Sequence, residues 1–202
     1  LHKLGDTVFT VPAVREVIKK YPSSITIVCF DHSKKIYQQT FNDVTYLVLN
    51  KEDFNFSGRL ASSKARSKLK KLHPNIIIDL KGSIISASLI FNARCKKIYG
   101  INEIYYKYIY DKFSLIRTTP HQVDIYFDAI RTFIPDVENH FLGYPIEYKH
   151  EKTILIQPFA GWKSKEWGFY KFIKLYKKLS LEYNCYFIFP EGIIKTDVVT
   201  QL

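Results

Sequence analysis

The sequence predicts an α/β fold in which parallel strands form a sheet with helices on both faces. Short aliphatic runs of strand length alternate along the chain with amphipathic segments of helix length. The run at residues 25–30 is apolar throughout, as expected of a strand that is covered on both faces. Strands that alternate with helices are typical of a parallel sheet with right-handed crossovers.

The expected elements follow one another closely from residue 10 onward. Val11, Val14 and Ile18 recur at helical spacing and predict a helix at residues 10–21. The next elements, in order, are a strand at 25–30, a helix at 33–40, a strand at 44–49, a basic helix at 60–72, a strand at 76–80, a helix at 83–92 and a short strand at 97–99. Residues 101–119 are rich in tyrosine without a clean period, which indicates an irregular segment, and a helix is predicted at 121–133.

Residues 136–150 are polar and are the best linker candidate. After them come a strand at 154–157, a loop at 158–166, a helix at 167–183 and a strand at 185–189. One strand-helix-strand unit cannot bury both faces of its sheet, so it is interpreted as the beginning of a larger domain. We therefore expect a first domain at residues 1–145 and a second, truncated one at 146–202.

The start of the chain indicates a fragment. Methionine is absent, and Gly5 and Asp6 form a predicted turn with no strand before it. In an α/β unit, a Gly-Asp turn that leads into a helix normally follows a strand. We therefore expect that a first strand is missing ahead of Leu1.

The composition indicates a globular protein with excess positive charge. The 202 residues are 47% hydrophobic and 24% charged, and no apolar run approaches the roughly 20 residues that cross a bilayer. The three cysteines lack the spacing of a disulfide framework or a zinc site, so a reducing cytosol and no metal are expected. The net charge of +11 predicts attraction to nucleic acid, an anionic membrane face, or a phosphorylated small molecule or glycolipid.

The turn Leu4-Gly5-Asp6-Thr7 is the first candidate site. Gly5 lets a ligand approach the main chain, and Asp6 is beside free N–H groups of the coming helix. Such a corner can hold an anion or place a general base. On local sequence alone, the simpler interpretation is that Asp6 is an N-cap. Residues 79–82 are expected at the same edge, because ligands bind beyond the carboxyl ends of parallel strands.

Two further segments carry positive charge. Between Asp53 and Asp79 there is no acidic residue but there are six basic ones: Arg59, Lys64, Arg66, Lys68, Lys70 and Lys71. They form either an anion clamp or a solvated helix face. The loop at 158–166 has Gly161 for backbone freedom, and Lys163 and Lys165 ahead of a helix, a place that phosphates favour. Its spacing is not that of a Walker A loop.

Taken together, these motifs resemble glycosyltransferase family 9, the ADP-heptose:lipopolysaccharide heptosyltransferases. The matching motifs are residues 4–7 with 10–15, residues 76–83 with Ser86 and Ala87, and the loop Lys165-Glu166-Trp167, in the order of the family. The resemblance runs from residue 4 to about Gly192. The segment His121 to Asp124 is similar to the helix that closes the family's first domain.

The resemblance implies a GT-B architecture with two Rossmann-like domains, the first binding the acceptor and the second the nucleotide sugar. It implies that Asp6 is the general base of an inverting, metal-independent transfer from ADP-heptose or a related donor. The implied donor-binding residues are Lys165, Ala160 and Gly161, and the residues implied to face an anionic lipopolysaccharide core acceptor are Gly5, Arg59, Lys64, Arg66, Lys81 and Gly82. No cofactor besides the sugar nucleotide is implied. The implied location is the cytoplasm, peripheral at the inner face of the inner membrane.

The sequence also departs from the family pattern. Lys81 stands where the family often has Gln, Ala160 and Gly161 stand where some members have hydroxyl residues, and the later Asp-x-Gly-x-x-His donor motif is absent. One alternative is a family member that transfers a different sugar. Another is a basic nucleic-acid-binding module that uses residues 59–71, with tyrosines between residues 105 and 110 as stacking surfaces. The family resemblance itself predicts no nucleic acid partner.

Overall fold

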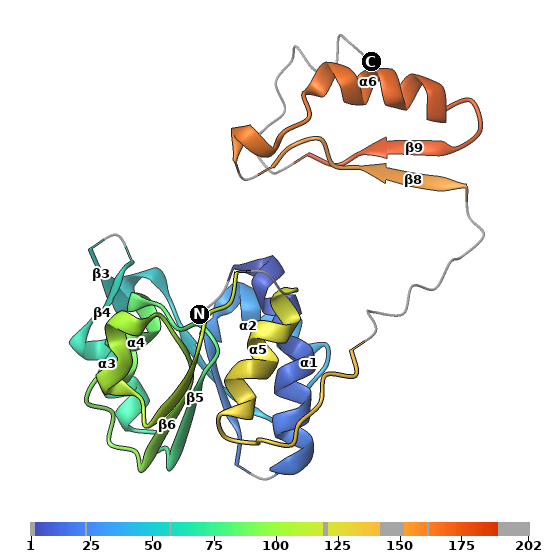
Figure 1. Cartoon of the computed structure of the whole chain (residues 1–202). Helices are drawn as coiled ribbons and strands as arrows, with labels where there is room; N and C mark the ends of the chain where they lie inside the picture. The colour runs from blue at the N-terminus through green and yellow to red at the C-terminus, as the bar shows by residue number, and fades with distance from the viewer. Residues whose placement is uncertain are drawn as a thin grey trace. The chain divides into compact units, whose positions relative to one another are not determined.

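A computed structural model of the chain describes residues 3–22, 24–56, 58–118, 121–141, 152–160 and 162–189. The chain divides into two units, Leu1–Leu142 and Gly143–Leu202. Each unit contains parallel strands with helices packed against them (Figure 1). The α/β class that the sequence predicts is therefore confirmed.

The first unit contains two parallel sheets instead of one. Strand β1 (Thr26–Phe30) pairs with β2 (Thr45–Leu49), and β6 (Lys97–Asn102) lies between β5 (Ile76–Asp79) and β7 (Lys112–Leu115). No described strand joins β1 to β5. The continuous sheet that the strand-helix alternation predicts is thus interrupted between these two strands.

Helices cover both faces of these sheets (Figure 1). The helices of this unit are α1 (Leu4–Lys20), α2 (Asp31–Gln38), α3 (Ser63–Lys70), α4 (Ile84–Ile90) and α5 (Gln122–Arg131). On one face, α1, α2 and α5 pack around Val11, Tyr37 and Phe127. On the other face, α3 and α4 pack around Leu69 and Leu89. Burial of these apolar side chains is the main stabilising contribution to the unit.

Helix α1 begins earlier than the predicted start at residue 10. Lys3 is its N-cap residue, and the Thr7 amide donates a 2.9 Å hydrogen bond to the Lys3 carbonyl. Gly5 and Asp6 are therefore inside the first helical turn, and the interpretation of Asp6 as the N-cap is wrong. The early start has a tertiary cause, because the Thr7 hydroxyl lies 2.8 Å from that of Ser33 on α2 and secures this turn.

Two other segments also differ from their predictions. Residues Leu60–Ala61, predicted to be helical, form β4 and pair antiparallel with β3 (Phe54–Asn55), which follows the 3₁₀ turn η1 (Lys51–Asp53). Helix α3 starts only after Ser62, whose hydroxyl accepts a 3.2 Å hydrogen bond from the Ala65 amide. The segment predicted to be irregular at 101–119 contains the end of β6, the 3₁₀ turn η2 (Ile104–Ile109) and β7. Because β7 has only four residues, its pairing with β6 is what identifies it.

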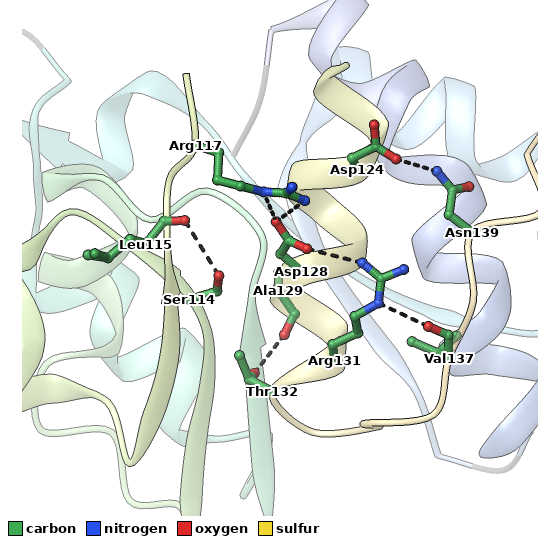
Figure 2. A network of polar contacts seen from close by, with 10 residues as sticks. All are labelled: Ser114, Leu115, Arg117, Asp124, Asp128, Ala129, Arg131, Thr132, Val137 and Asn139. Carbon is green, nitrogen blue, oxygen red and sulfur yellow. Dashed lines mark hydrogen bonds and ion pairs between the residues drawn. The ribbon is translucent and has the colours of Figure 1, made fainter. Parts of the chain in front are cut away.

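Polar contacts hold the segments before and after α5 against that helix (Figure 2). Arg117, which follows β7, forms an ion pair with Asp128 on α5. Arg131 Nη1 donates a 3.1 Å hydrogen bond to the other carboxylate oxygen of Asp128, and Arg131 Nε donates a 3.0 Å bond to the Val137 carbonyl. These contacts fix the last described stretch of the first unit.

In the second unit, β8 (Thr153–Ile156) pairs in parallel with β9 (Asn184–Phe187), and α6 (Phe169–Leu179) connects them. The loop after β8 contains the 3₁₀ turn η3 (Lys163–Lys165). Helix α6 starts two residues later than predicted, because Gly168 has a φ of 98°, outside the helical region. Most of the predicted linker, residues 142–150, lies outside the described residues. No helix in the described part of the chain is long and apolar enough to cross a membrane.

Candidate active site

Asp6 lies in the first turn of α1, at the edge where β1 ends. Helix α2 directly follows β1, and the contact between Thr7 and Ser33 brings the first turns of α1 and α2 together. The Asp6 side chain is half-buried, and its carboxylate makes no hydrogen bond or ion pair with any described residue. Unpaired N–H groups and the helix dipole favour negative charge at this place. The carboxylate is therefore available to accept a hydrogen bond from a ligand.

A buried tyrosine on α5, which the sequence analysis did not single out as a site residue, lies within electrostatic range of Asp6. Tyr126 is only 2% exposed, and burial raises the pKa of its hydroxyl to about 12. The negative charge of Asp6 adds to this rise, whereas the 3.2 Å hydrogen bond from Gln122 Nε2 opposes it. In the sequence, Tyr126 is only one of several apolar residues at helical spacing, which indicates a core position. Its proximity to Asp6 arises from the packing of α1 on α5.

His121 marks the same edge of the first unit. Its Nδ1 accepts a 3.3 Å hydrogen bond from the Val123 amide, so the exposed imidazole caps α5. The ring also makes an edge-to-face contact with Phe9 on α1, with ring centroids 5.3 Å apart. Phe9 follows Asp6 by one helical turn, and the beginnings of α1 and α5 are therefore neighbours.

Asp79, at the carboxyl end of β5, holds a turn together. It is 7% exposed; its Oδ2 accepts a 2.6 Å hydrogen bond from the Tyr110 hydroxyl, and its Oδ1 accepts a 2.8 Å bond from the Lys81 amide. Burial and the charge of Asp79 raise the pKa of Tyr110, so that hydroxyl keeps its proton. The Lys81 side chain is half-buried and forms no ion pair with a described residue.

The two glycines of the predicted acceptor site differ in their surroundings. Gly82 is buried with a φ of 60°, and a Cβ there would lie 2.6 Å from the Ile101 carbonyl oxygen. Only glycine fits this position, so Gly82 shapes the turn. Gly5 is exposed, and a Cβ would meet nothing within 4 Å. A ligand can therefore approach the main chain at Gly5 but not directly at Gly82.

Some of the basic side chains between Asp53 and Asp79 form no ion pair with a described residue, whereas Lys68 does. Arg59, in the β3–β4 hairpin, and Lys64, on α3, are exposed, and Arg66 is half-buried; none of them forms an ion pair with a described residue. Lys68, however, donates 2.7 Å hydrogen bonds to both carboxylate oxygens of Asp53, which is 2% exposed. Burial by itself raises the pKa of Asp53, but the contacts with Lys68 and the Asn50 amide outweigh it and lower that pKa. Lys68 is thus a structural residue.

In the second unit, the predicted donor loop surrounds η3. Lys165 is the last residue of this turn and is exposed. The Ala160 amide donates a 3.5 Å hydrogen bond to Glu166 Oε1, which brings the two ends of the loop together. Gly161 lies outside the described residues. Lys165 is therefore one residue away from the contact partner of Ala160.

The described residues include no group of three or more His, Cys, Asp or Glu side chains that could hold a metal ion. Metal-independent transfer remains a prediction.

Comparison with known proteins identifies the fold. No protein-family model matches the chain, and no curated protein matches it. One similar structure is a glycosyl transferase family 9 protein from Veillonella parvula DSM 2008. The match covers 100% of this chain and 64% of the Veillonella chain, with 18% identity and a TM-score of 0.76. The chain has the fold of glycosyltransferase family 9. E. coli heptosyltransferase WaaC, solved with ADP-2-deoxy-2-fluoro heptose and with ADP, covers 95% of this chain at 14% identity and a TM-score of 0.73.

The family 9 fold confirms the GT-B-type α/β class that the resemblance implies. The chain spans 64% of the Veillonella structure and 66–67% of the two WaaC structures. At 14–18% identity the likeness concerns the fold. The roles of Asp6, Lys165 and the basic residues stay predictions.

Proposed function

We propose that this chain provides the acceptor-binding domain and the opening of the donor-binding domain of a glycosyltransferase. The reaction transfers heptose or a related sugar from a nucleotide sugar, ADP-heptose, to a lipopolysaccharide core. The family 9 fold across the chain, with the Asp6 carboxylate free of described partners in the first turn of α1, carries this proposal. Ligands of α/β folds bind at the edge where Asp6 lies.

In the proposed reaction, Asp6 is the general base. The acceptor hydroxyl oxygen attacks the anomeric carbon of the donor while the bond from that carbon to the diphosphate breaks. Asp6 takes the hydroxyl proton, the diphosphate leaves with the electron pair, and attack opposite the leaving group inverts the configuration. A base within hydrogen-bond reach lowers the barrier to such a transfer. No metal and no cofactor besides the donor are required in this scheme.

The departing diphosphate needs positive charge or N–H donors near it. Lys165 is exposed in a loop ahead of α6, and an ammonium group there can reach phosphate oxygens. The backbone at Ala160 and Gly161 supplies the other proposed contacts, because neither residue has a polar side chain. The solved WaaC structures contain ADP and an ADP-sugar, which supports a nucleotide-sugar donor here.

The proposed acceptor is an anionic, phosphorylated glycolipid core. Arg59 and Arg66 can each grip a phosphate at two points, and Lys64 adds point charge. Gly5 offers an open approach to α1, Lys81 adds a cation at the sheet edge, and Gly82 shapes the turn that carries Lys81. A family member that transfers a different sugar fits these groups equally well.

We further propose peripheral contact with the cytoplasmic face of the inner membrane. Ile104, Tyr105 and Tyr108 on η2 are 58%, 80% and 90% exposed, and Lys107 Nζ lies 5.0 Å from the Tyr108 ring centroid. Tyrosine rings and lysines suit a membrane interface, because each combines an apolar body with a polar or charged end. Excess positive charge attracts anionic lipids.

A nucleic-acid-binding module is the weaker alternative. It depends on the same basic segment, in which Lys68 is already paired with Asp53. It also leaves unexplained the family 9 fold and the half-buried carboxylate of Asp6. Filter binding separates the two functions: tight, salt-sensitive binding of generic oligonucleotides, with no binding of lipopolysaccharide core, would contradict the glycosyltransferase proposal.

The decisive experiment is Asp6→Asn in the complete protein. Loss of the base is expected to lower transfer by at least about 100-fold, while donor affinity and thermal midpoint stay unchanged. Asp31→Asn is the matched control, because Asp31 lies exposed in the first turn of the neighbouring helix α2. If Asp6→Asn retains near-normal turnover, Asp6 is not the base.

A further inference from the structure

Four buried hydroxyl side chains connect the beginning of α1 with α2. None of them is more than 4% exposed: Thr7 and Thr10 on α1, and Ser33 and Tyr37 on α2. The hydroxyl oxygens of Thr7 and Ser33 lie 2.8 Å apart. Those of Thr10 and Tyr37 lie 2.6 Å apart. Because a buried hydroxyl is costly without a hydrogen-bond partner, these two contacts determine where the beginning of α1 lies against α2.

The direction of both contacts follows from the hydrogens that are available. The Thr7 hydroxyl donates a 2.9 Å hydrogen bond to the Lys3 carbonyl, and the Thr10 hydroxyl donates a 2.7 Å bond to the Thr7 carbonyl. A hydroxyl has one hydrogen, so each threonine hydroxyl accepts in its contact with α2. Ser33 therefore donates to Thr7, and Tyr37 donates to Thr10. Two chains of hydrogen bonds thus lead from α2 into the first turns of α1.

These first turns need support from outside α1. The N-cap residue, Lys3, provides no side-chain cap hydrogen bond. Pro12 lies inside the helix and has no N–H, so it cannot donate the bond that a helical residue normally makes to the carbonyl four positions earlier. Residues 4–11 are therefore joined to the rest of α1 by fewer hydrogen bonds than in an uninterrupted helix. Both chains from α2 enter α1 in this weakly joined segment.

Asp6 lies in the same segment, directly before Thr7 and about one turn before Thr10. A second helix contacts the segment through Phe9, whose ring packs edge to face against His121 of α5. Contacts with α2 and with α5 together set the rotation of α1 about its own axis. Successive residues are about 100° apart around a helix, so even a small rotation of α1 redirects the Asp6 carboxylate.

We propose that Ser33 and Tyr37 are positioning residues for Asp6, and that their hydrogen bonds to Thr7 and Thr10 hold its carboxylate where it can take the acceptor proton. This inference rests on the proposed function, in which Asp6 is the general base. Ser33 and Tyr37 themselves are too deeply buried to touch a substrate. They act through geometry, because a displacement of about 1 Å at a reacting group can lower the rate about 100-fold.

The first test measures transfer from ADP-heptose to lipopolysaccharide core by the complete protein with Ser33→Ala and Tyr37→Phe combined. We expect kcat to fall at least about tenfold, while KM for the donor changes by less than about twofold, because the proposed donor contacts are in the second unit. Tyr46→Phe is the matched control. Its hydroxyl donates a 2.8 Å bond to the Phe41 carbonyl and not to α1, so its removal should leave kcat unchanged.

Asp6→Asn distinguishes positioning from a general loss of stability. If the two hydroxyl groups act through Asp6, their removal from the Asp6→Asn variant should lower the thermal midpoint but should not lower kcat further. A second loss of about tenfold in that background would overturn the inference. An unchanged kcat after removal of both hydroxyl groups would also overturn it, while a large effect of Asp6→Asn alone would leave the proposed function intact.

Hydrogen exchange gives a readout that does not depend on sugar transfer. Without the two hydroxyl groups of α2, the amides of residues 8–10 should exchange at least about tenfold faster, whereas those of residues 15–19, beyond Pro12, should change by less than about twofold. Equal acceleration in both stretches would contradict a local hold of α2 on the first turns. This result would overturn the inference whatever the activity of Asp6→Asn.

If the combined variant does not fold, Thr10 provides a milder pair of substitutions. Thr10→Val keeps the shape of the side chain but removes the acceptor for Tyr37, whereas Thr10→Ser keeps the hydroxyl. We expect the valine variant alone to lower kcat and to accelerate exchange at residues 8–10. The same kcat and the same exchange in the two variants would overturn the inference.

Discussion

The Tyr110 hydroxyl donates a 2.6 Å hydrogen bond to Asp79 Oδ2 within the first unit. The bond connects the residue after η2 with the last residue of β5. Asp79 also accepts the Lys81 amide, so this pair holds the turn at the proposed acceptor edge. Asp79 is only 7% exposed, so its buried carboxylate needs these two hydrogen-bond donors to offset the cost of leaving water.

Tyr110→Phe is expected to destabilise the protein by about 1.5–3 kcal/mol, because a buried carboxylate loses a hydrogen bond. The measurement is the free energy of unfolding by urea. Tyr99→Phe is the matched control, since it removes a tyrosine hydroxyl from β6 that has no described partner, and it should change stability by less than about 0.5 kcal/mol. Equal unfolding midpoints for the two variants would contradict a stabilising role for the bond.

The stability of the fold should decrease in alkali, because three buried tyrosines have raised pKa values in the folded state. Burial is the main cause that raises the pKa of Tyr37, Tyr110 and Tyr126 above the ordinary value near 10. The folded state therefore holds these protons more tightly than the unfolded state. Their contribution is complete below pH 10 and is lost as the pH rises; for Tyr126 the window extends to about pH 12. Each tyrosine contributes a slope of at most about 1.4 kcal/mol per pH unit.

Two variants distinguish the contribution of Tyr126 to the alkaline loss of stability from that of the other tyrosines. Tyr126→Phe should make the alkaline loss of stability shallower. Asp6→Asn removes a negative charge that raises the pKa of Tyr126, so the tyrosine should ionise at lower pH, as followed by tyrosinate absorbance. An unchanged titration in Asp6→Asn would mean that the two side chains are not within electrostatic range.

Lys165→Ala is expected to weaken ADP binding by the complete protein by about tenfold or more, because a hydrogen bond to a charged phosphate is lost. Isothermal titration calorimetry measures this affinity. Lys163→Ala is the control, since Lys163 begins the same exposed turn η3. The same affinity in both variants would exclude Lys165 from the donor site.

Replacing Arg59, Lys64 and Arg66 together by Gln should weaken binding of phosphorylated lipopolysaccharide core by at least about tenfold. The effect should shrink at high salt, where exposed charges are screened. A control removes the same charge elsewhere on the first unit, at the exposed residues Arg15, Lys20 and Lys35. If both triple variants lose affinity equally, net charge alone governs binding.

Changing Tyr105 and Tyr108 to Ser should lower partition onto vesicles of anionic phospholipid by about tenfold, because buried ring surface is lost. Vesicle flotation measures the bound fraction. The control changes Tyr170 and Tyr186, which are 66% and 57% exposed in the second unit, to Ser. Equal losses in the two variants would argue against η2 as the membrane contact.

The repeating elements could be predicted from the sequence because their signals are local. The apolar runs around Ile27 and Ile77 mark strands, and the spacing of Val11, Val14 and Ile18 marks a helix within a few residues of where it lies. Strand β7 and the β3–β4 hairpin were missed, since such short strands exist only by pairing with a neighbour. The ordered motifs of residues 4–7 with 10–15, residues 76–83 and the loop at 165–167 predicted the family 9 fold.

For the candidate site, the sequence by itself determined which side chains carry charge and near which strand or helix end each belongs. Only the tertiary structure decided that Asp6 is inside α1 near Tyr126, and that Asp53 neutralises Lys68. It alone revealed that β1 and β5, which belong to separate sheets, line the same cavity. The physical reason is that secondary-structure signals act over a few residues, whereas burial, ion pairing and strand pairing join residues far apart in the chain.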